Sequence, residues 1–218
     1  LAEIWQGSLK DCQNAIVVVC GTAVGGAVIV NREIVSGKNF MAGEFNYVIT
    51  DSKDDYKMSN SLAETAGAQA LLNSVSVETG IPVEELNGEK AFSLANQGND
   101  KALAGIRNHA KKLAINIHNC QYMFDPEKIA VGGGISEQPL LLQLIREELA
   151  KINGMYPWTL PVPEVTSCRF YNDANLIGAV YVHMKAREKK ISLEKVNELM
   201  ELLENRREGE YLRALLTE

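Results

Sequence analysis

The sequence NAIVVVCGTAVGGAVIVNREIVSGKNFMAGE, from Asn14 to Glu44, decides how the fold is interpreted. Its uninterrupted apolar run over 16–19 predicts a strand that is covered on both faces. A glycine-rich turn follows, and an equally apolar strand leaves it. Glycines let a backbone approach a ligand closely, and successive N–H groups in such a turn can bind a phosphate. The turn residues that this interpretation singles out are Gly21, Thr22, Gly25 and Gly26. A plain β-hairpin turn explains the same residues equally well.

Composition and charge limit the class of protein. The 218 residues are 46% hydrophobic, enough for one domain with a sizeable core, or one domain plus a tail. A net charge of -6 without a basic face argues against nucleic-acid binding, and no apolar run approaches the roughly 20 residues of a membrane span. The four scattered cysteines favour buried thiols in a reducing cytosol over disulfides. We therefore expect a cytoplasmic protein that does not bind membranes, and no nucleic-acid binding by this chain itself.

Strands and helices interleave along the chain, which predicts the α/β class. Strands are predicted over 16–19, 27–30, 33–35 and 128–131, with an edge strand over the proline-containing 161–168. Helices are predicted over 59–77, 101–122, 139–152 with Ser136 as N-cap, and from Asn172 or Asp173 onward. Between them, 82–99 reads as a short helical insertion. The chain divides into a domain over 1–186 and a charged amphipathic helical tail over 187–218, whose apolar stripe suits docking on the parent protein or on an oligomer partner.

Four segments resemble motifs of the ROK family, which groups sugar kinases with repressors, and they come in the family's order. GTAVGGA (21–27) resembles its GTGIGGG phosphate loop, and AGEFN (42–46) its AGE-x-GH sugar-binding segment. FDPEKIAVGGGIS (124–136) resembles its nucleotide-side segment NPe-IViGGGis, and NDANLIGA (172–179) its C-terminal helix start. The matches cover about 1–186, and the chain is identified as a member of this family.

The resemblance implies the actin-like, ribonuclease-H-like ATPase fold, in which two lobes hold ATP and a sugar in the cleft between them. This chain resembles only the C-terminal lobe, a mixed central sheet flanked by helices. The family's N-terminal DxGGT loop is absent, and Leu1-Ala2-Glu3 resembles the residues just after its catalytic NDAN segment. The catalytic Asp is therefore expected upstream of residue 1, with no catalytic residue in this chain.

On the nucleotide side, the resemblance assigns two glycine-rich segments to ATP. Gly21, Thr22, Gly25 and Gly26 would hold the phosphates through backbone N–H groups and the threonine hydroxyl. Gly132, Gly133 and Gly134 follow a strand and precede a helix, so they would place helix N–H groups beside the nucleotide. Without the family, a GGG run is as well explained as a flexible connector.

On the sugar side, the resemblance points to Glu44, whose carboxylate can accept hydrogen bonds from vicinal hydroxyls. Asn46 falls in the part of the segment where the family has its Gly-His pair and this chain has no histidine, although the Asn46 amide can still donate and accept. Glu64 stands one position away from a family glutamate that contacts sugar, and a plain surface role fits it equally well. The alternative for Glu44 is a solvated loop residue.

Metal binding is not expected. The family's zinc-site histidine is replaced, and no cysteine occurs between Tyr47 and Ser61 to supply the remaining ligands. Three histidines, His109, His118 and His183, lack a ligand spacing and read as structural or surface residues. The altered zinc segment resembles a zinc-free branch of the family, similar to β-glucoside kinases or glucokinases.

The function implied by the resemblance is an ATP- and Mg²⁺-dependent hexose or glucoside kinase. Its partners would be sugar, ATP and the N-terminal lobe of the same protein, in a homodimer. This chain alone should be inactive, because half of the cleft is missing. Two alternatives stay open: a sugar-sensing repressor whose DNA-binding domain lies outside this chain, and a degenerate binding protein.

Overall fold

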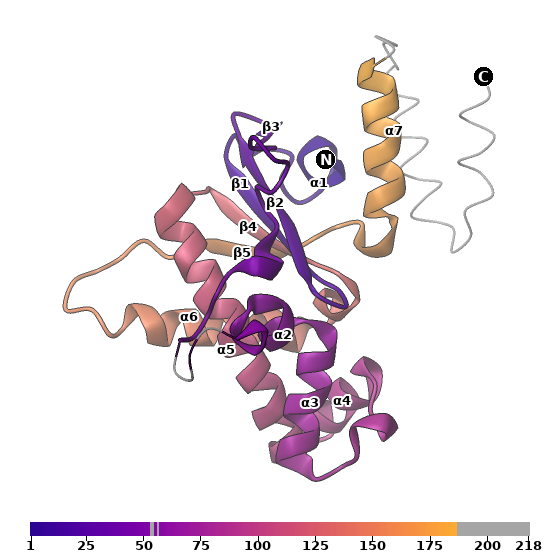
Figure 1. Cartoon of the computed structure of the whole chain (residues 1–218), viewed down its shortest axis with the longest axis vertical. Coiled ribbons are helices and arrows are strands. Elements are labelled where there is room, and N and C mark those ends of the chain that lie inside the picture. Colours follow the sequence, from indigo (N-terminus) through magenta and orange to yellow (C-terminus); the bar gives the residue numbers. More distant parts are fainter. Residues whose placement is uncertain (53–54, 56, 187–218) are drawn as a thin grey trace. The chain divides into compact units, whose positions relative to one another are not determined.

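The computed structural model describes residues 1–52, 55 and 57–186 (Figure 1). Contacts divide the chain into two units, Leu1–Asn175 and Leu176–Glu218. Helix α7 (Ala174–Ala186) contains the described part of the second unit. The helical tail predicted over 187–218 lies outside the described residues. The account below therefore concerns the first unit.

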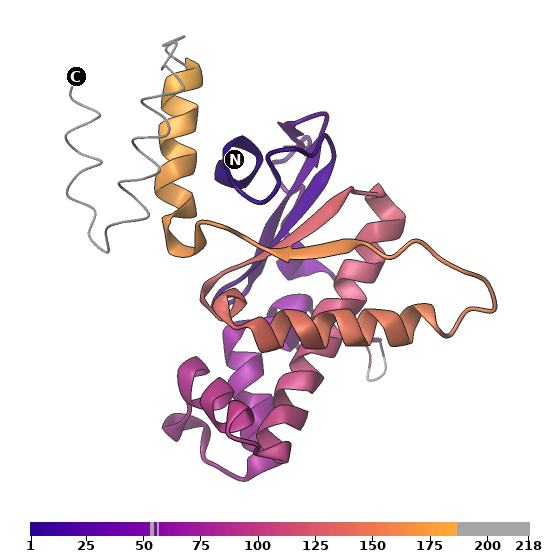
Figure 2. The ribbon, with the colours of Figure 1, turned by 180° about the vertical axis from the view of Figure 1, so that it is seen from behind.

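A five-stranded mixed sheet forms the centre of the first unit, in the order β3-β2-β1-β4-β5 (Figures 1 and 2). Its strands are β1 (Ala15–Cys20), β2 (Val24–Val30), β3 (Glu33–Ile34), β4 (Lys128–Gly132) and β5 (Glu164–Ser167). Strand β2 pairs antiparallel with β1 and β3, whereas β4 pairs parallel with β1 and β5. The predicted mixed sheet and the edge position of β5 are both confirmed.

Strand residues alternate between two hydrophobic clusters, one on each face of the sheet. Ile16 and Val18 of β1 are fully buried in the larger cluster, which contains the helices. Val17 and Ala15 belong to the smaller cluster, together with Leu9 from the segment after α1 (Ala2–Trp5). The sheet is thus covered on both faces along residues 15–18 of β1, as predicted, whereas Val19 is exposed.

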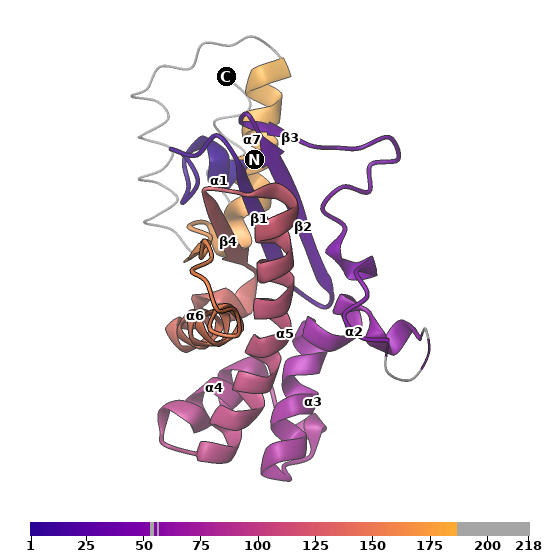
Figure 3. The same ribbon diagram turned by 90° about the vertical axis from the view of Figure 1, so that its left-hand side faces the viewer.

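Helix α5 (Asp100–Phe124) is the central helix of the larger cluster and packs against α2, α3, α4 and α6 (Figure 3). The other helices are α2 (Leu62–Ala66), α3 (Ala68–Thr79), α4 (Gly88–Asn96) and α6 (Pro139–Asn153). Short 3-10 turns precede or join them: η1 (Phe45–Tyr47), η2 (Met58–Asn60), η3 (Val83–Glu85), η4 (Gly134–Glu137) and η5 (Tyr171–Asp173). Asn99 caps α5, because its Oδ1 accepts the N–H of Ala102 at 3.0 Å. None of the described helices is both long and apolar enough to cross a bilayer.

Two helix predictions are wrong in detail. The single helix expected over 59–77 is interrupted at Gly67, where a Cβ atom would lie 2.5 Å from the carbonyl oxygen of Thr22. Ser136 does not cap α6; it lies in η4, and its Oγ donates to the carbonyl of Gly133 at 2.7 Å. Helix α6 starts instead from Gln138, with a proline in its first turn.

Candidate functional site

A pocket of about 640 Å³ lies where the parallel strands β1 and β4 end. It is lined by Cys20, Gly21, Thr22, Ala68, Gly88, Glu89, Phe92, Gly134, Ile135 and Gln138. Open α/β sheets bind ligands beyond the carboxyl ends of their strands, and ligand pockets are typically about 300–1,000 Å³. Position and size therefore make this pocket the candidate site.

The β1–β2 turn forms one wall of the pocket and is held in place by two backbone hydrogen bonds. Gly21 N–H donates to the carbonyl of Ala23 at 2.9 Å, and the Gly21 carbonyl accepts the N–H of Ala68 at 2.8 Å. The second bond ties the turn to the first residue of α3. The start of a helix carries a partial positive charge, so an anion bound at this turn would be stabilised by α3.

Gly25 and Gly26 lie outside the turn, contrary to the prediction. Both belong to β2, where they pair with Val19 and Val18 of β1, and neither lines the pocket. A Cβ atom on Gly26 would lie 2.5 Å from the ring of Phe45. The carbonyl oxygen of Val17 lies even closer to that position, so Gly26 is explained by the close approach of both Val17 of β1 and Phe45.

The Gly132–Gly134 segment is divided between two roles. Gly133 has a φ of +89°, and a Cβ there would lie 2.7 Å from the carbonyl carbon of Cys20. Gly134 begins η4 and lines the pocket. The flexible-connector interpretation does not fit, because Gly133 closes the end of β4 tightly onto the end of β1.

The predicted sugar-side residues lie next to the start of β2. Gly43, with a φ of +89°, crosses β2 so closely that a Cβ would lie 2.9 Å from the carbonyl oxygen of Gly26. Glu44 follows and is exposed. Asn46, in η1, accepts the N–H of Val24 at 2.8 Å through Oδ1, while its Nδ2 donates to Glu44 Oε2 at 3.4 Å.

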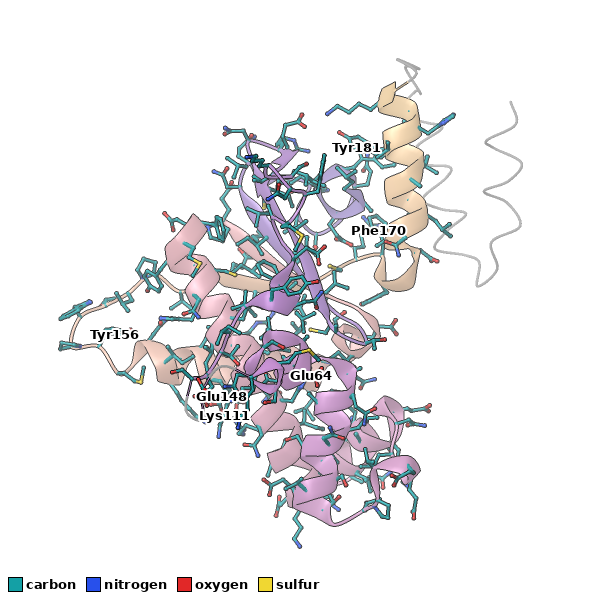
Figure 4. The ribbon with its side chains drawn as sticks, in the orientation of Figure 1. Glu64, Lys111, Glu148, Tyr156, Phe170 and Tyr181 are labelled. Atoms are coloured by element: carbon teal, nitrogen blue, oxygen red, sulfur yellow. The ribbon has the colours of Figure 1, made fainter. Side chains whose placement is uncertain are left out.

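Glu64, labelled in Figure 4, is exposed on α2. Helix α2 packs against η1, so the structure places Glu64 on the helix next to the segment that carries Glu44 and Asn46. None of these three residues lines the pocket. The structure thus separates the predicted nucleotide side from the predicted sugar side, with the start of β2 between them.

Sequence reasoning missed the contribution of α4. Gly88, Glu89 and Phe92 form a wall of the pocket, although 82–99 was interpreted only as an insertion. A local signal exists for the helix itself, since Asn87 Oδ1 accepts the N–H of Lys90 at 2.7 Å as an N-cap. Its position at the pocket depends on packing against α5, which one sequence does not reveal.

The pocket wall contains one thiol. Cys20 is buried, and burial raises its pKa to about 12. Its thiol is therefore protonated at neutral pH and forms a neutral wall, not a nucleophile. Within 1–52, 55 and 57–186, no three or more His, Cys, Asp or Glu side chains form a group that could hold a metal ion.

The histidines of α5 do not line the pocket. His109 is buried, and burial lowers its pKa to about 4, so it is neutral near pH 7. His118 packs against Tyr122 with ring centroids 4.8 Å apart. Both positions fit the structural interpretation of these residues.

The chain belongs to the ROK family, whose model matches residues 1–186. The fold agrees: the mixed sheet flanked by helices is shared with solved ROK proteins, and the prediction of one lobe of an actin-like ATPase fold is confirmed.

Three similar proteins define the comparison. A β-glucoside kinase of Klebsiella pneumoniae is 32% identical over 184 residues, covering 83% of this chain and 59% of that protein. A ROK family protein from Streptococcus pneumoniae TIGR4, solved in complex with sucrose, is 28% identical with a TM-score of 0.76, covering 86% of this chain and 63% of that one. A ROK family glucokinase from Streptomyces griseus, in complex with glucose and AMPPNP, shares the fold at 22% identity and a TM-score of 0.74, covering 83% and 64%. The chain thus spans about 60% of the length of its relatives.

Proposed function

We propose that this chain is the C-terminal lobe of an ATP-dependent sugar kinase, which transfers the γ-phosphate to a hydroxyl of a hexose or a glucoside. The observation that carries the proposal is the pocket at the carboxyl ends of β1 and β4, with Glu44 held beside the start of β2. Similarity to a β-glucoside kinase favours a glucoside as substrate. The second lobe and the catalytic Asp are expected from the part of the relatives that this chain does not span.

The residues that line the pocket suit a bound ATP. The turn residues Gly21 and Thr22 lie against the start of α3, which suits a phosphate, and α4 adds Phe92 to the pocket wall. Mg²⁺ usually keeps several waters and binds substrate phosphates with only one or two carboxylates, so we expect it on the phosphates of ATP. A phosphate contact for Gly25 or Gly26, and a homodimer, stay predictions from the resemblance.

The proposal is tested with the complete protein. Purified enzyme is mixed with Mg²⁺-ATP and a panel of sugars that includes glucose and an aryl β-glucoside, and ADP release is measured. We expect release only with sugar, and faster with the glucoside. Sugar binding without ADP release would contradict the kinase and favour the repressor or a binding protein. The 218-residue chain alone should release no ADP.

The role of Glu44 has a matched test. Its carboxylate can accept charge-assisted hydrogen bonds from sugar hydroxyls, each contributing about 1.5–3 kcal/mol. Glu44→Gln should therefore raise the sugar dissociation constant at least about 10-fold, measured by calorimetry on the complete protein. Glu33→Gln, an exposed glutamate on β3, is the control and should leave the affinity unchanged. Equal affinity in wild type and Glu44→Gln would remove Glu44 from the site.

A further inference from the structure

The amide of Asn46 joins two parts of the proposed site that are far apart in sequence. Its Oδ1 accepts the N–H of Val24 at 2.8 Å, and its Nδ2 donates to Glu44 Oε2 at 3.4 Å. Val24 is the first residue of β2 and directly follows the turn that carries Gly21 and Thr22. One half-buried side chain therefore contacts both the end of the turn and the carboxylate proposed to bind sugar.

Hydrogen-bond chemistry fixes the orientation of this amide. A backbone N–H can only donate, so the Asn46 atom that faces Val24 must be the oxygen. The amide nitrogen then has to face Glu44, whose ionised carboxylate can only accept. Turning the amide over would place a donor against a donor and an acceptor against an acceptor. The link therefore has a single satisfied arrangement.

The segment that carries Glu44 is also held firmly on β2. Gly43 approaches Gly26 and Ala27 so closely that a Cβ would lie 2.9–3.0 Å from their backbone atoms. Phe45, on the other side of Glu44, is buried and packs against Gly26. With the backbone fixed on both sides, the Asn46 side chain is the hydrogen-bonded link between Val24 and Glu44.

We propose that Asn46 is a positioning residue, not a sugar ligand, and that it couples the Glu44 carboxylate to the phosphate side of the site. The inference rests on the proposed function. It gives the site a regulatory property: nucleotide at the turn orders Val24 and Asn46, which sets Glu44 for sugar, and sugar favours nucleotide in return. Such couplings are reciprocal and typically change an affinity about 5–150-fold.

The test measures sugar affinity of the complete protein by calorimetry, with and without saturating AMPPNP. In the wild type, AMPPNP should tighten sugar binding at least about 5-fold. In Asn46→Ala this gain should fall below about 2-fold. The double variant Glu44→Gln/Asn46→Ala should bind sugar no more weakly than Glu44→Gln alone, because Asn46 acts through Glu44. Asn39→Ala, in the exposed loop before Gly43, is the control and should keep the full gain.

A conservative variant separates the two hydrogen bonds. Asn46→Asp keeps an acceptor for Val24 but replaces the donor to Glu44 with a like charge, so it should fold normally and still weaken sugar binding. If Asn46→Ala lowers the melting temperature, Asn46→Asp replaces it in the affinity measurements.

Three outcomes would overturn the inference. In the first, AMPPNP tightens sugar binding of Asn46→Ala as much as that of the wild type. In the second, the losses of sugar affinity add up in the double variant, which would make Asn46 a direct ligand. In the third, Asn46→Asp binds sugar with normal affinity. Absence of sugar binding in the wild type would instead overturn the proposed function, and this inference with it.

Discussion

Gly133→Ala should destabilise the fold strongly, and two other glycines separate its causes. Gly133 combines a φ of +89° and a ψ of 165° with close contact to Cys20. Gly80, which ends α3, has a φ of +76°, but nothing lies within 4 Å of a Cβ placed there. Gly134 has neither problem. An alanine at Gly134 thus adds no strain, an alanine at Gly80 adds backbone strain alone, and an alanine at Gly133 adds backbone strain and steric overlap.

The expected losses follow from these geometries. Alanine in the backbone region of Gly133 costs about 1–3 kcal/mol, because that region is essentially restricted to glycine. Forcing a Cβ to 2.7 Å from the carbonyl carbon of Cys20 adds an overpacking cost of about 1–3 kcal/mol. Gly133→Ala should therefore lose about 2–6 kcal/mol of the roughly 5–15 kcal/mol that stabilises a typical domain. Gly80→Ala should lose about 1–2 kcal/mol, from the left-handed backbone alone.

The assay is urea unfolding of the 218-residue chain, followed by far-ultraviolet circular dichroism, with the midpoint and slope fitted for each variant. Gly134→Ala is the control and should stay within about 0.5 kcal/mol of the wild type. The order of stability should be Gly134→Ala, then Gly80→Ala, then Gly133→Ala. Equal midpoints for Gly133→Ala and Gly134→Ala would refute the idea that the end of β4 is closed tightly onto β1.

Two further predictions concern buried side chains. Glu3, only 4% exposed, accepts the backbone N–H groups of Arg169 and Phe170 at 3.0 and 3.1 Å. Glu3→Ala should therefore lower the free energy of unfolding, measured in urea, by about 2–4 kcal/mol, and a loss below about 0.5 kcal/mol would show that water replaces the carboxylate. Burial holds the pKa of His109 at about 4, below its unfolded value near 6.5. Between these pH values the unfolded state binds more protons than the folded state does. The free energy of unfolding should therefore fall by about 3 kcal/mol as the pH drops from about 6.5 to 4. His109→Leu should flatten that part of the stability–pH curve, and a curve unaltered by this substitution would contradict the assignment.

The regular elements could be predicted because their signals are local. The β-branched run of β1 needs only strand periodicity and a cover on both faces, and both were found. Helix α5 shows buried residues at steps of three and four, such as Ile106, Ala110, Leu113 and Ile117. The prolines before β5 predicted an edge strand, because proline cannot donate to a neighbouring strand.

The site was harder to predict because its geometry depends on contacts between distant segments. Gly25 and Gly26 look like part of a loop, yet they continue β2, and no local signal shows that Phe45 will pack on Gly26. Gly67 interrupts an apolar helical pattern because the Thr22 carbonyl lies against it, 45 positions away in the numbering. The contribution of α4 to the pocket has the same origin. In each case, a tertiary contact between distant segments decided the local structure, and no local sequence signal shows that contact.

Close backbone approach explains why the motifs have glycine at positions that do not line the pocket. Gly26 admits Phe45, Gly43 lets its segment cross β2, and Gly133 brings β4 against the end of β1. Two of these contacts place segments of the proposed site, because Glu44 follows Gly43 directly and Gly134 follows Gly133. A Cβ atom at any of these positions would push one segment away from the sheet edge, which separates the carboxylate from the turn. Glycines that do not line the pocket can therefore be as necessary for its shape as the residues that do.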